Sequence, residues 1–163
     1  MNSVYIILGG NLGNKRKNLV LAHRMVRRKI GKIRRLSNIY ETEPWGFEDS
    51  NTFLNQVAEI HTSLEPLEIL EKIKRIEAHL GRTINQHVKY QPRQMDIDML
   101  FFNNEVIHLP GLTIPHPLLH IRNFALVPLC ELAADFIHPV FNKTILQLKA
   151  ECKDNRWTRI AAE

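Results

Sequence analysis

The sequence is organised around one stretch, Pro92-Arg93-Gln94-Met95-Asp96-Ile97-Asp98-Met99-Leu100-Phe101-Phe102. From Met95 onward the stretch is apolar, as expected for a buried β-strand, except that it contains two carboxylates. Alternate side chains of a strand share a face, so Asp96 and Asp98 point to the same side, with Cα atoms roughly 6.5 Å apart. Ile97 and Met99 point to the opposite side. Only one face of this strand is therefore polar.

Two carboxylates beside an apolar core require a cationic partner, because an unpaired buried charge is strongly destabilising. One candidate is a metal ion, and the other is a basic side chain such as that of Arg93, three residues upstream. The stretch alone does not separate a metal site from a buried ion pair. The surrounding segments have to distinguish the two.

Length and composition limit the class of protein. With 163 residues the chain can bury a substantial core, and we expect one domain over residues 1–163. No run approaches the roughly 20 apolar residues of a membrane helix, and Met1–Tyr5 lacks the features of a secretion signal. Cys130 and Cys152 cannot form a disulfide framework. These features predict a cytoplasmic protein without a membrane partner.

The formal charge of +5 indicates an anionic partner, such as a nucleotide, a phosphate ester or a nucleic acid. Many basic residues lie in one early segment, namely Lys15, Arg16, Lys17, Arg24, Arg27, Arg28, Lys29, Lys32, Arg34 and Arg35. On a helix such a cluster is usually a solvated face, which is the interpretation we favour here.

Hydrophobic periodicity and turn residues predict the other elements. They are strands over residues 4–8, 33–40 and 53–61, helices over 15–30 and 66–80, a hairpin-like turn at 103–105, an apolar and helical stretch over 122–132, and a smaller element after 139. Helices and short strands alternate irregularly, and hairpins link several strands. This pattern favours an α+β sandwich with a mostly antiparallel sheet over a doubly wound parallel sheet.

Two further segments have alternative interpretations. The turn Gly9-Gly10-Asn11-Leu12-Gly13 precedes a helix and could cradle a phosphate, but it matches neither nucleotide-binding glycine fingerprint, so a tight turn is the better prediction. Phe53 and Asn55 share a strand face, where an aromatic ring beside an amide can stack on and hydrogen-bond a flat heterocycle. Without other evidence, packing at a sheet edge is the more frequent explanation of such a pair.

The polar segment over residues 82–93 leads directly to the two acids. It is expected to bring the basic side chains of Arg82, Lys89 and Arg93 close to them. Carboxylates opposite basic side chains suit phosphoryl transfer, because Mg²⁺ bridges carboxylates to phosphates while cations neutralise the transferring group. His116 could bond a phosphate oxygen or be an ordinary surface histidine. No residue has an evident activating partner for a covalent mechanism.

The ordered set of motifs resembles 6-hydroxymethyl-7,8-dihydropterin pyrophosphokinase, a folate-pathway family. The matching motifs are Gly9-Gly10-Asn11-Leu12-Gly13, Tyr40-x-Thr42-x-Pro44-x-Gly46, Phe53-Leu54-Asn55, Arg75-Ile76-Glu77, Gly81-Arg82, Pro92-Arg93-x-x-Asp96-Ile97-Asp98, Ile114-Pro115-His116 and Arg122-Asn123-Phe124. The resemblance extends from Tyr5 to about Leu132. It implies an α+β sandwich with a ferredoxin-like core and extra C-terminal elements.

The resemblance also implies an activity. The family transfers the β,γ-diphosphate of ATP to the hydroxymethyl oxygen of the pterin and releases AMP. Asp96 and Asp98 would bind two Mg²⁺ ions, and Arg82 and Arg93 would stabilise the diphosphate. Contacts to ATP would come from Glu77, Lys89, Tyr90, Met99, Thr113, His116 and Arg122. The pterin pocket would be formed by Gly9, Asn11, Thr42, Glu43, Trp45, Phe53, Asn55 and Phe124, with Phe53 and Phe124 on either side of the ring.

The chain departs from the family before the acids. The family usually has Arg-Trp-Gly-Pro-Arg, where this chain has Lys89-Tyr90-Gln91-Pro92-Arg93, and Ile84 replaces a second arginine. In the family this loop closes over ATP. Because the chain departs from the family motif in this loop, we expect the loop to close less tightly over ATP here. Tyr90→Trp combined with Gln91→Gly should tighten ATP binding, and an unchanged affinity would contradict this hypothesis.

Two other functions fit parts of the sequence. A basic RNA-binding module could stack bases on Phe53 and Phe124, but Asp96 and Asp98 would repel its phosphates. A kinase for another substrate would share the acids but not the pterin motifs. We therefore expect a monomeric enzyme that binds ATP, a pterin and Mg²⁺, and neither nucleic acid nor a membrane.

Overall fold

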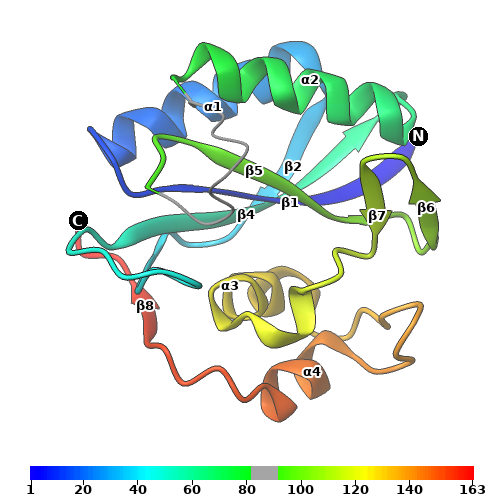
Figure 1. Cartoon of the computed structure of the whole chain (residues 1–163). Coiled ribbons are helices and arrows are strands. Elements are labelled where there is room, and N and C mark those ends of the chain that lie inside the picture. The colour runs from blue at the N-terminus through cyan, green and yellow to red at the C-terminus, as the bar shows by residue number, and fades with distance from the viewer. Residues whose placement is uncertain (82–91) are drawn as a thin grey trace.

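A six-stranded antiparallel sheet lies between two pairs of helices (Figure 1). The computed structural model describes residues 1–81 and 92–163. The sheet contains β1 (Asn2–Gly10), β2 (Lys32–Leu36), β3 (Tyr40–Thr42), β4 (Phe53–Thr62), β5 (Asp96–Phe102) and β8 (Thr158–Ile160). One face is covered by α1 (Lys15–Lys29) and α2 (Pro66–His79), the other by α3 (Asn123–Ala133) and α4 (Ile145–Glu151). The predicted α+β sandwich is confirmed.

The strand order is β5-β1-β4-β3-β8, and β2 also pairs with β4. In chain order, β1-α1-β2-β4-α2-β5 form a ferredoxin-like βαββαβ unit, with β1 between β4 and β5. Two further strands, β3 and β8, extend the sheet from β4, and β8 and α4 are the extra C-terminal elements. A separate hairpin consists of β6 (Ile107–Leu109) and β7 (Leu112–Ile114).

The helices begin where the sequence predicts. The side chain of Asn14 accepts a hydrogen bond from the backbone N–H of Lys17 and caps α1. Pro66 occupies the first turn of α2, which also has a capping box between Glu65 and Glu68. Across residues 1–81 and 92–163, no helix has the length and apolarity needed to cross a membrane.

The sheet separates two apolar cores. Along β1, Val4, Ile6 and Leu8 pack toward α1 and α2, whereas Tyr5 and Ile7 pack toward α3 and α4. This alternation is the period of a strand that is buried on both faces. Because both neighbours of β1 are fully formed strands, its position in the sheet is tightly constrained.

The same alternation orients the acids of β5. Ile97 and Met99 are buried in the core under α1 and α2. Asp96 and Asp98 therefore face the side of the sheet that α3 covers, and they lie on one face as predicted.

Two local predictions differ from the structure. The strand expected over residues 33–40 is divided into β2 and β3, which pair with opposite ends of β4. Ser37 lies at the break, where its backbone N–H and its hydroxyl bond the backbone of Val57, and its carbonyl accepts from Gln56. The turn at residues 103–105 does not return to β5, because the next strand, β6, pairs with β7.

Candidate active site

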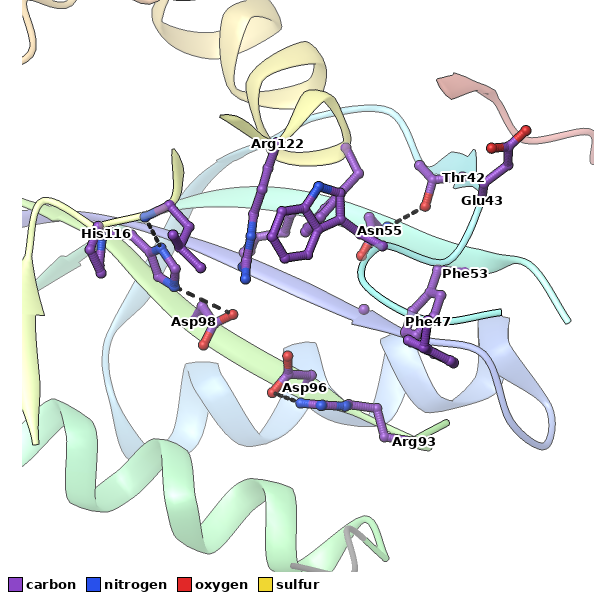
Figure 2. Close-up of a pocket in the computed structure, with 16 residues that line it drawn as sticks. Thr42, Glu43, Phe47, Phe53, Asn55, Arg93, Asp96, Asp98, His116 and Arg122 are labelled. Carbon is purple, nitrogen blue, oxygen red and sulfur yellow. Dashed lines mark hydrogen bonds and ion pairs between the residues drawn. The ribbon is translucent and has the colours of Figure 1, made fainter. Parts of the chain in front are cut away.

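A cavity of about 340 Å³ opens on the α3 side of the sheet (Figure 2). Its lining includes twelve of the residues predicted for the site, namely Gly9, Thr42, Glu43, Trp45, Phe53, Asn55, Arg93, Asp96, Asp98, His116, Arg122 and Phe124. The residues come from β1, β3, β4, β5, the start of α3 and the loops between them. Segments that are far apart in the sequence thus meet at one place.

The cavity has two halves, a carboxylate half with Asp96 and Asp98 and an amide half with Asn55, and Gly9 lies between them. In the register of the sheet it is opposite Asn55 of β4 on one side and Asp96 of β5 on the other. A Cβ atom at position 9 would lie 2.0 Å from Oδ1 of Asn55. The absence of a side chain at this position therefore leaves space for the amide, and Gly9 lies on the strand between the one that carries this amide and the one that carries the carboxylate.

The carboxylate half contains one of the two partners that the sequence left open, the basic side chain of Arg93. Nη1 of Arg93 lies 2.9 Å from Oδ1 of Asp96, so an ion pair is present (Figure 2). Asp98 is partly exposed to the cavity, with Oδ2 4.0 Å from Nε2 of His116. The ion-pair interpretation is thus confirmed for Asp96 in this structure, while both acids remain accessible from the cavity.

His116 is held as a neutral imidazole. Its Nδ1 accepts a hydrogen bond from the backbone N–H of Leu118 at 3.1 Å, which leaves the proton on Nε2, the atom nearest Asp98. Burial, followed by the positive charge of Arg122, lowers the pKa of His116 to about 4, against an opposing effect of Asp96. At neutral pH His116 is therefore a hydrogen-bond donor without charge.

The acids fit a Mg²⁺ ion that is shared with a substrate. Among the described residues, no three His, Cys, Asp or Glu side chains gather closely enough to bind a metal by themselves. Mg²⁺ prefers oxygen ligands and usually binds through one or two carboxylates, with substrate phosphates and water completing its octahedral coordination. Asp96 and Asp98 supply that number of carboxylates on one wall of the cavity.

The amide half is built on β3 and β4. Asn55 is buried, and its Nδ2 donates a hydrogen bond to Oγ1 of Thr42 at 2.8 Å. Thr42 lies opposite Phe53 in the pairing of the two strands. This bond fixes the orientation of the Asn55 amide, so its polar edge is preorganised toward the cavity.

Aromatic side chains and one arginine form the rest of the amide half. Phe53 makes an edge-to-face contact with Phe47, with ring centroids 6.0 Å apart, and Trp45 contacts Phe124 in the same manner at 6.5 Å. The guanidinium of Arg122 lies 4.4 Å from the centre of the Trp45 ring and 5.4 Å from that of Phe124. This contact surface is suited to a flat ring.

Four predicted residues lie outside the lining of the cavity. The side chain of Asn11 accepts from the backbone N–H of Arg93 at 3.0 Å and donates to the carbonyl of Asn51 at 3.2 Å, so it links two segments that border the cavity. Glu77 is buried on α2, where Oε2 accepts from the backbone N–H of Ile97 at 3.0 Å, between the two acids.

The other two residues are farther from the chemistry. The side chain of Met99 is buried in the core on the opposite face of the sheet from Asp98. Thr113 is exposed on the β7 strand of the hairpin. Three further predicted residues, Arg82, Lys89 and Tyr90, lie outside the described residues, as do Ile84 and Gln91.

The cavity also has lining residues that sequence reasoning missed, namely Ile7, Phe47, Pro117 and Leu118. Ile7 shares a face of β1 with Gly9, a spacing of two that could have revealed it. Phe47 lies two residues after Trp45 in the turn-rich loop, where no periodic pattern in the sequence points to it.

Two carboxylates beside an aromatic cavity form the arrangement expected of a phosphoryl-transfer enzyme. A family model described as "7,8-dihydro-6-hydroxymethylpterin-pyrophosphokinase (HPPK)" matches residues 5–134, and the chain belongs to this family.

Similar proteins support the assignment. The chain is 38% identical over 151 residues to a protein of Aquifex aeolicus, covering 93% of this chain and 92% of that one. It is 43% identical over 135 residues to a protein of Bacillus subtilis, covering 80% and 78%. Both are named 2-amino-4-hydroxy-6-hydroxymethyldihydropteridine pyrophosphokinase.

Solved structures show the same fold. A crystal structure of Plasmodium falciparum HPPK-DHPS matches with a TM-score of 0.76 and 22% identity, and the match covers 93% of this chain. This chain spans only 43% of the length of that protein. The ferredoxin-like fold predicted from the sequence is therefore confirmed by a distant relative as well.

Proposed function

We infer that this chain transfers the diphosphate of ATP to the hydroxymethyl group of 6-hydroxymethyl-7,8-dihydropterin, releasing AMP, in folate biosynthesis. Membership of the pyrophosphokinase family supports the reaction. The observation that supports this site is the register around Gly9, where Asn55 and Asp96 lie on the two strands that flank β1 and line one cavity. The two substrates would therefore meet above β1.

The amide half would bind the pterin. Phe53 and Phe124 would contact the two faces of the ring, and the amide of Asn55 would hydrogen-bond its edge. Backbone around Thr42, Glu43 and Trp45 would complete the pocket, with Gly9 as its floor. Asn11, which does not line the cavity, would act indirectly through its bonds to Arg93 and Asn51.

The carboxylate half would bind ATP. Asp96 and Asp98 would hold Mg²⁺, with two ions expected, and His116 and Arg122 would contact the nucleotide. Bound Mg²⁺ would neutralise the phosphates and orient them for in-line attack. Further ATP contacts are predicted from Glu77, Met99, Thr113, Lys89 and Tyr90. Glu77 would help by fixing the backbone between the two acids.

The reaction forms one phosphorus–oxygen bond, breaks another and releases one proton. The hydroxymethyl oxygen of the pterin attacks the β-phosphorus of ATP, the bond from that phosphorus to the α,β-bridging oxygen breaks, and AMP leaves with that oxygen. The hydroxyl proton would pass to solvent water as the new oxygen–phosphorus bond forms. Arg93 and Arg82 would stabilise the charge on the transferring group.

Arg93 has two possible partners in this scheme. In the structure it is paired with Asp96. A cation bound at Asp96 would replace the guanidinium, because both compete for the same carboxylate oxygens. Arg93 would then be released to the phosphate oxygens of ATP. The negative charge of Asp96 would thus be compensated both before and after ATP binds.

Product analysis tests the proposal. The enzyme should release AMP from ATP only when Mg²⁺ and hydroxymethyldihydropterin are both present, with one diphosphorylated pterin formed for each AMP. Release of ADP would indicate an ordinary kinase instead. The predicted monomeric state and cytoplasmic location can be checked by analytical ultracentrifugation and by cell fractionation.

A further inference from the structure

The C-terminal strap, residues 154–161, follows α4 and lies outside the residues that the family model matches. From α4 it returns along the molecule to the sheet, where β8 pairs with β3 (Figure 1). Most of its side chains are exposed, so it adds little to either apolar core. Its polar contacts are therefore the informative feature.

The first contact is made by Asp154 at the start of α3. The carboxylate is almost completely buried, and its Oδ2 accepts from the backbone N–H of Asn123 at 3.1 Å. The backbone carbonyl of Asp154 accepts a second bond from the Asn123 side chain. These bonds satisfy a donor at the helix N-terminus and fix the residue between Arg122 and Phe124.

The second contact is made by Arg156 to the loop that contains Trp45. Its Nε donates to the carbonyl of Pro44 at 3.1 Å, and its own backbone N–H donates to Oδ1 of Asp154. One carboxylate and one guanidinium thus connect Pro44 to Asn123. Each of these two residues directly precedes a cavity residue, Trp45 and Phe124, whose rings are in contact.

The third contact is the pairing of β8 with β3. Thr158 lies opposite Thr42, whose hydroxyl accepts the bond from Asn55. Arg159 forms an ion pair with Glu41 at 3.3 Å, on the same strand. All three contacts of the strap therefore end next to residues that line the amide half of the cavity.

We propose that the strap positions the pterin half of the active site, with Asp154 and Arg156 as its positioning residues. The inference rests on the proposed function, since it assumes that the amide half binds the pterin. The strap thus links Pro44 to Asn123 outside the cavity, in addition to the contact of Trp45 with Phe124 inside it. With the strap, the spacing of Trp45 and Phe124 is set before a ligand arrives, which lowers the cost of ordering the pocket.

The decisive experiment compares Arg156→Ala with Lys153→Ala. Both remove one positive charge from nearby exposed positions, but the Lys153 side chain makes no hydrogen bond or ion pair among the described residues, whereas Arg156 donates to Pro44. Dissociation constants for hydroxymethyldihydropterin and for ATP would be measured by isothermal titration calorimetry, alongside the melting temperature. We expect Arg156→Ala to weaken pterin binding about fivefold, as for one lost hydrogen bond. ATP affinity and melting temperature should hardly change, and Lys153→Ala should behave as the parent protein.

Two further variants separate positioning from a purely structural role. Arg156→Lys retains a donor and should recover part of the pterin affinity. Asp154→Ala releases the start of α3, where Arg122 directly precedes the helix and Phe124 lies in its first turn, so it should weaken pterin and ATP binding together.

The outcomes are distinguishable from failure of the proposed function. If the parent protein does not bind hydroxymethyldihydropterin, the assignment of the pocket is wrong. If the parent binds it and Arg156→Ala binds it equally well, the positioning role is wrong. In Arg156→Ala, a lower melting temperature with equal losses for both ligands would show that the strap only stabilises the fold, which also overturns the inference.

Discussion

The guanidinium of Arg122 stacks on the indole ring of Trp45, with its central carbon 4.4 Å from the ring centre. The same guanidinium lies 5.4 Å from the ring of Phe124, and its charge helps to lower the pKa of His116. Arg122 thus contacts the aromatic surface proposed for the pterin and influences the imidazole proposed for ATP. It is the physical connection between the two halves of the cavity.

This stack predicts a defined effect of Trp45 variants. Trp45→Leu removes the π-face but keeps an apolar side chain, and a partly desolvated cation–π contact is worth roughly 0.5–2 kcal/mol. We expect KM for ATP to rise about threefold to tenfold, because Arg122 loses the surface that orients it. Trp45→Phe retains an aromatic face and should lose less. Steady-state kinetics with each substrate varied in turn measures this, and equal KM values in all three proteins would contradict it.

The acids of β5 predict the loss of metal-dependent activity. Asp98→Asn preserves shape but removes one of two carboxylates available to Mg²⁺, so we expect turnover to fall by about 100-fold or more. Glu71→Gln is the matched control, because it makes the same charge change at an exposed residue of α2 paired with Arg75. AMP release would be followed at increasing Mg²⁺ concentration. Undiminished Mg²⁺-dependent turnover in Asp98→Asn would refute the metal assignment.

Much of this site could be predicted because it follows from local patterns. The alternation of β5 determined that Asp96 and Asp98 share a face, and a spacing of two identified Phe53 and Asn55. The pairing of β1 with both β4 and β5, which brings these residues together, depends on contacts far apart in sequence. No local pattern encodes such a pairing.

The features that the sequence did not predict also depend on contacts between residues far apart in the chain. Asp154 and Arg156 are an ordinary acid and base in a polar segment, and only the folded chain shows that they bond Asn123 and Pro44. The break at Ser37 depends on hydrogen bonds to residues about 20 positions away. Propensity favoured one continuous strand there, and tertiary pairing overrode it.

Buried histidines predict a loss of stability in mild acid. Burial, followed by the charge of His120, lowers the pKa of His138 to about 4, and that of His116 is lowered to about 4 by burial and Arg122. The unfolded chain therefore binds more protons than the folded one between pH 6.5 and about 4, so stability is complete above pH 6.5 and falls as pH decreases through this window.

The expected loss of stability follows from the lowered pKa values of the two histidines. Between pH 7 and 5 each imidazole should cost about 2 kcal/mol of unfolding free energy. Urea unfolding at several pH values measures the loss. His138→Asn is the informative variant, because an amide oxygen can replace the ring nitrogen that accepts from Val140 and Phe141. It should remove the contribution of His138 to the pH dependence, about 2 kcal/mol between pH 7 and 5, and a parent protein equally stable at pH 7 and pH 5 would rule out this explanation.

The close approach at Gly9 predicts that one methyl group will disturb pterin binding. In Gly9→Ala the new Cβ atom would lie 2.0 Å from Oδ1 of Asn55, so the amide must move and its bond to Thr42 must break. We expect pterin affinity to fall about tenfold, as for a displaced buried hydrogen-bonding group. Titration with hydroxymethyldihydropterin measures this loss directly.

A double variant distinguishes displacement of Asn55 from general damage to β1. In Asn55→Ala the atom that the methyl group would strike is absent, so adding Gly9→Ala should cost little further pterin affinity, and the two effects should be non-additive. Gly10→Ala provides the neighbouring comparison, because its Cβ would lie 2.1 Å from the backbone carbonyl oxygen of Gln94 instead. That variant should shift the segment next to Arg93 and weaken ATP binding more than pterin binding. Additive losses in the double variant would mean that Gly9 acts on the strand as a whole, and not through the amide that faces the pterin.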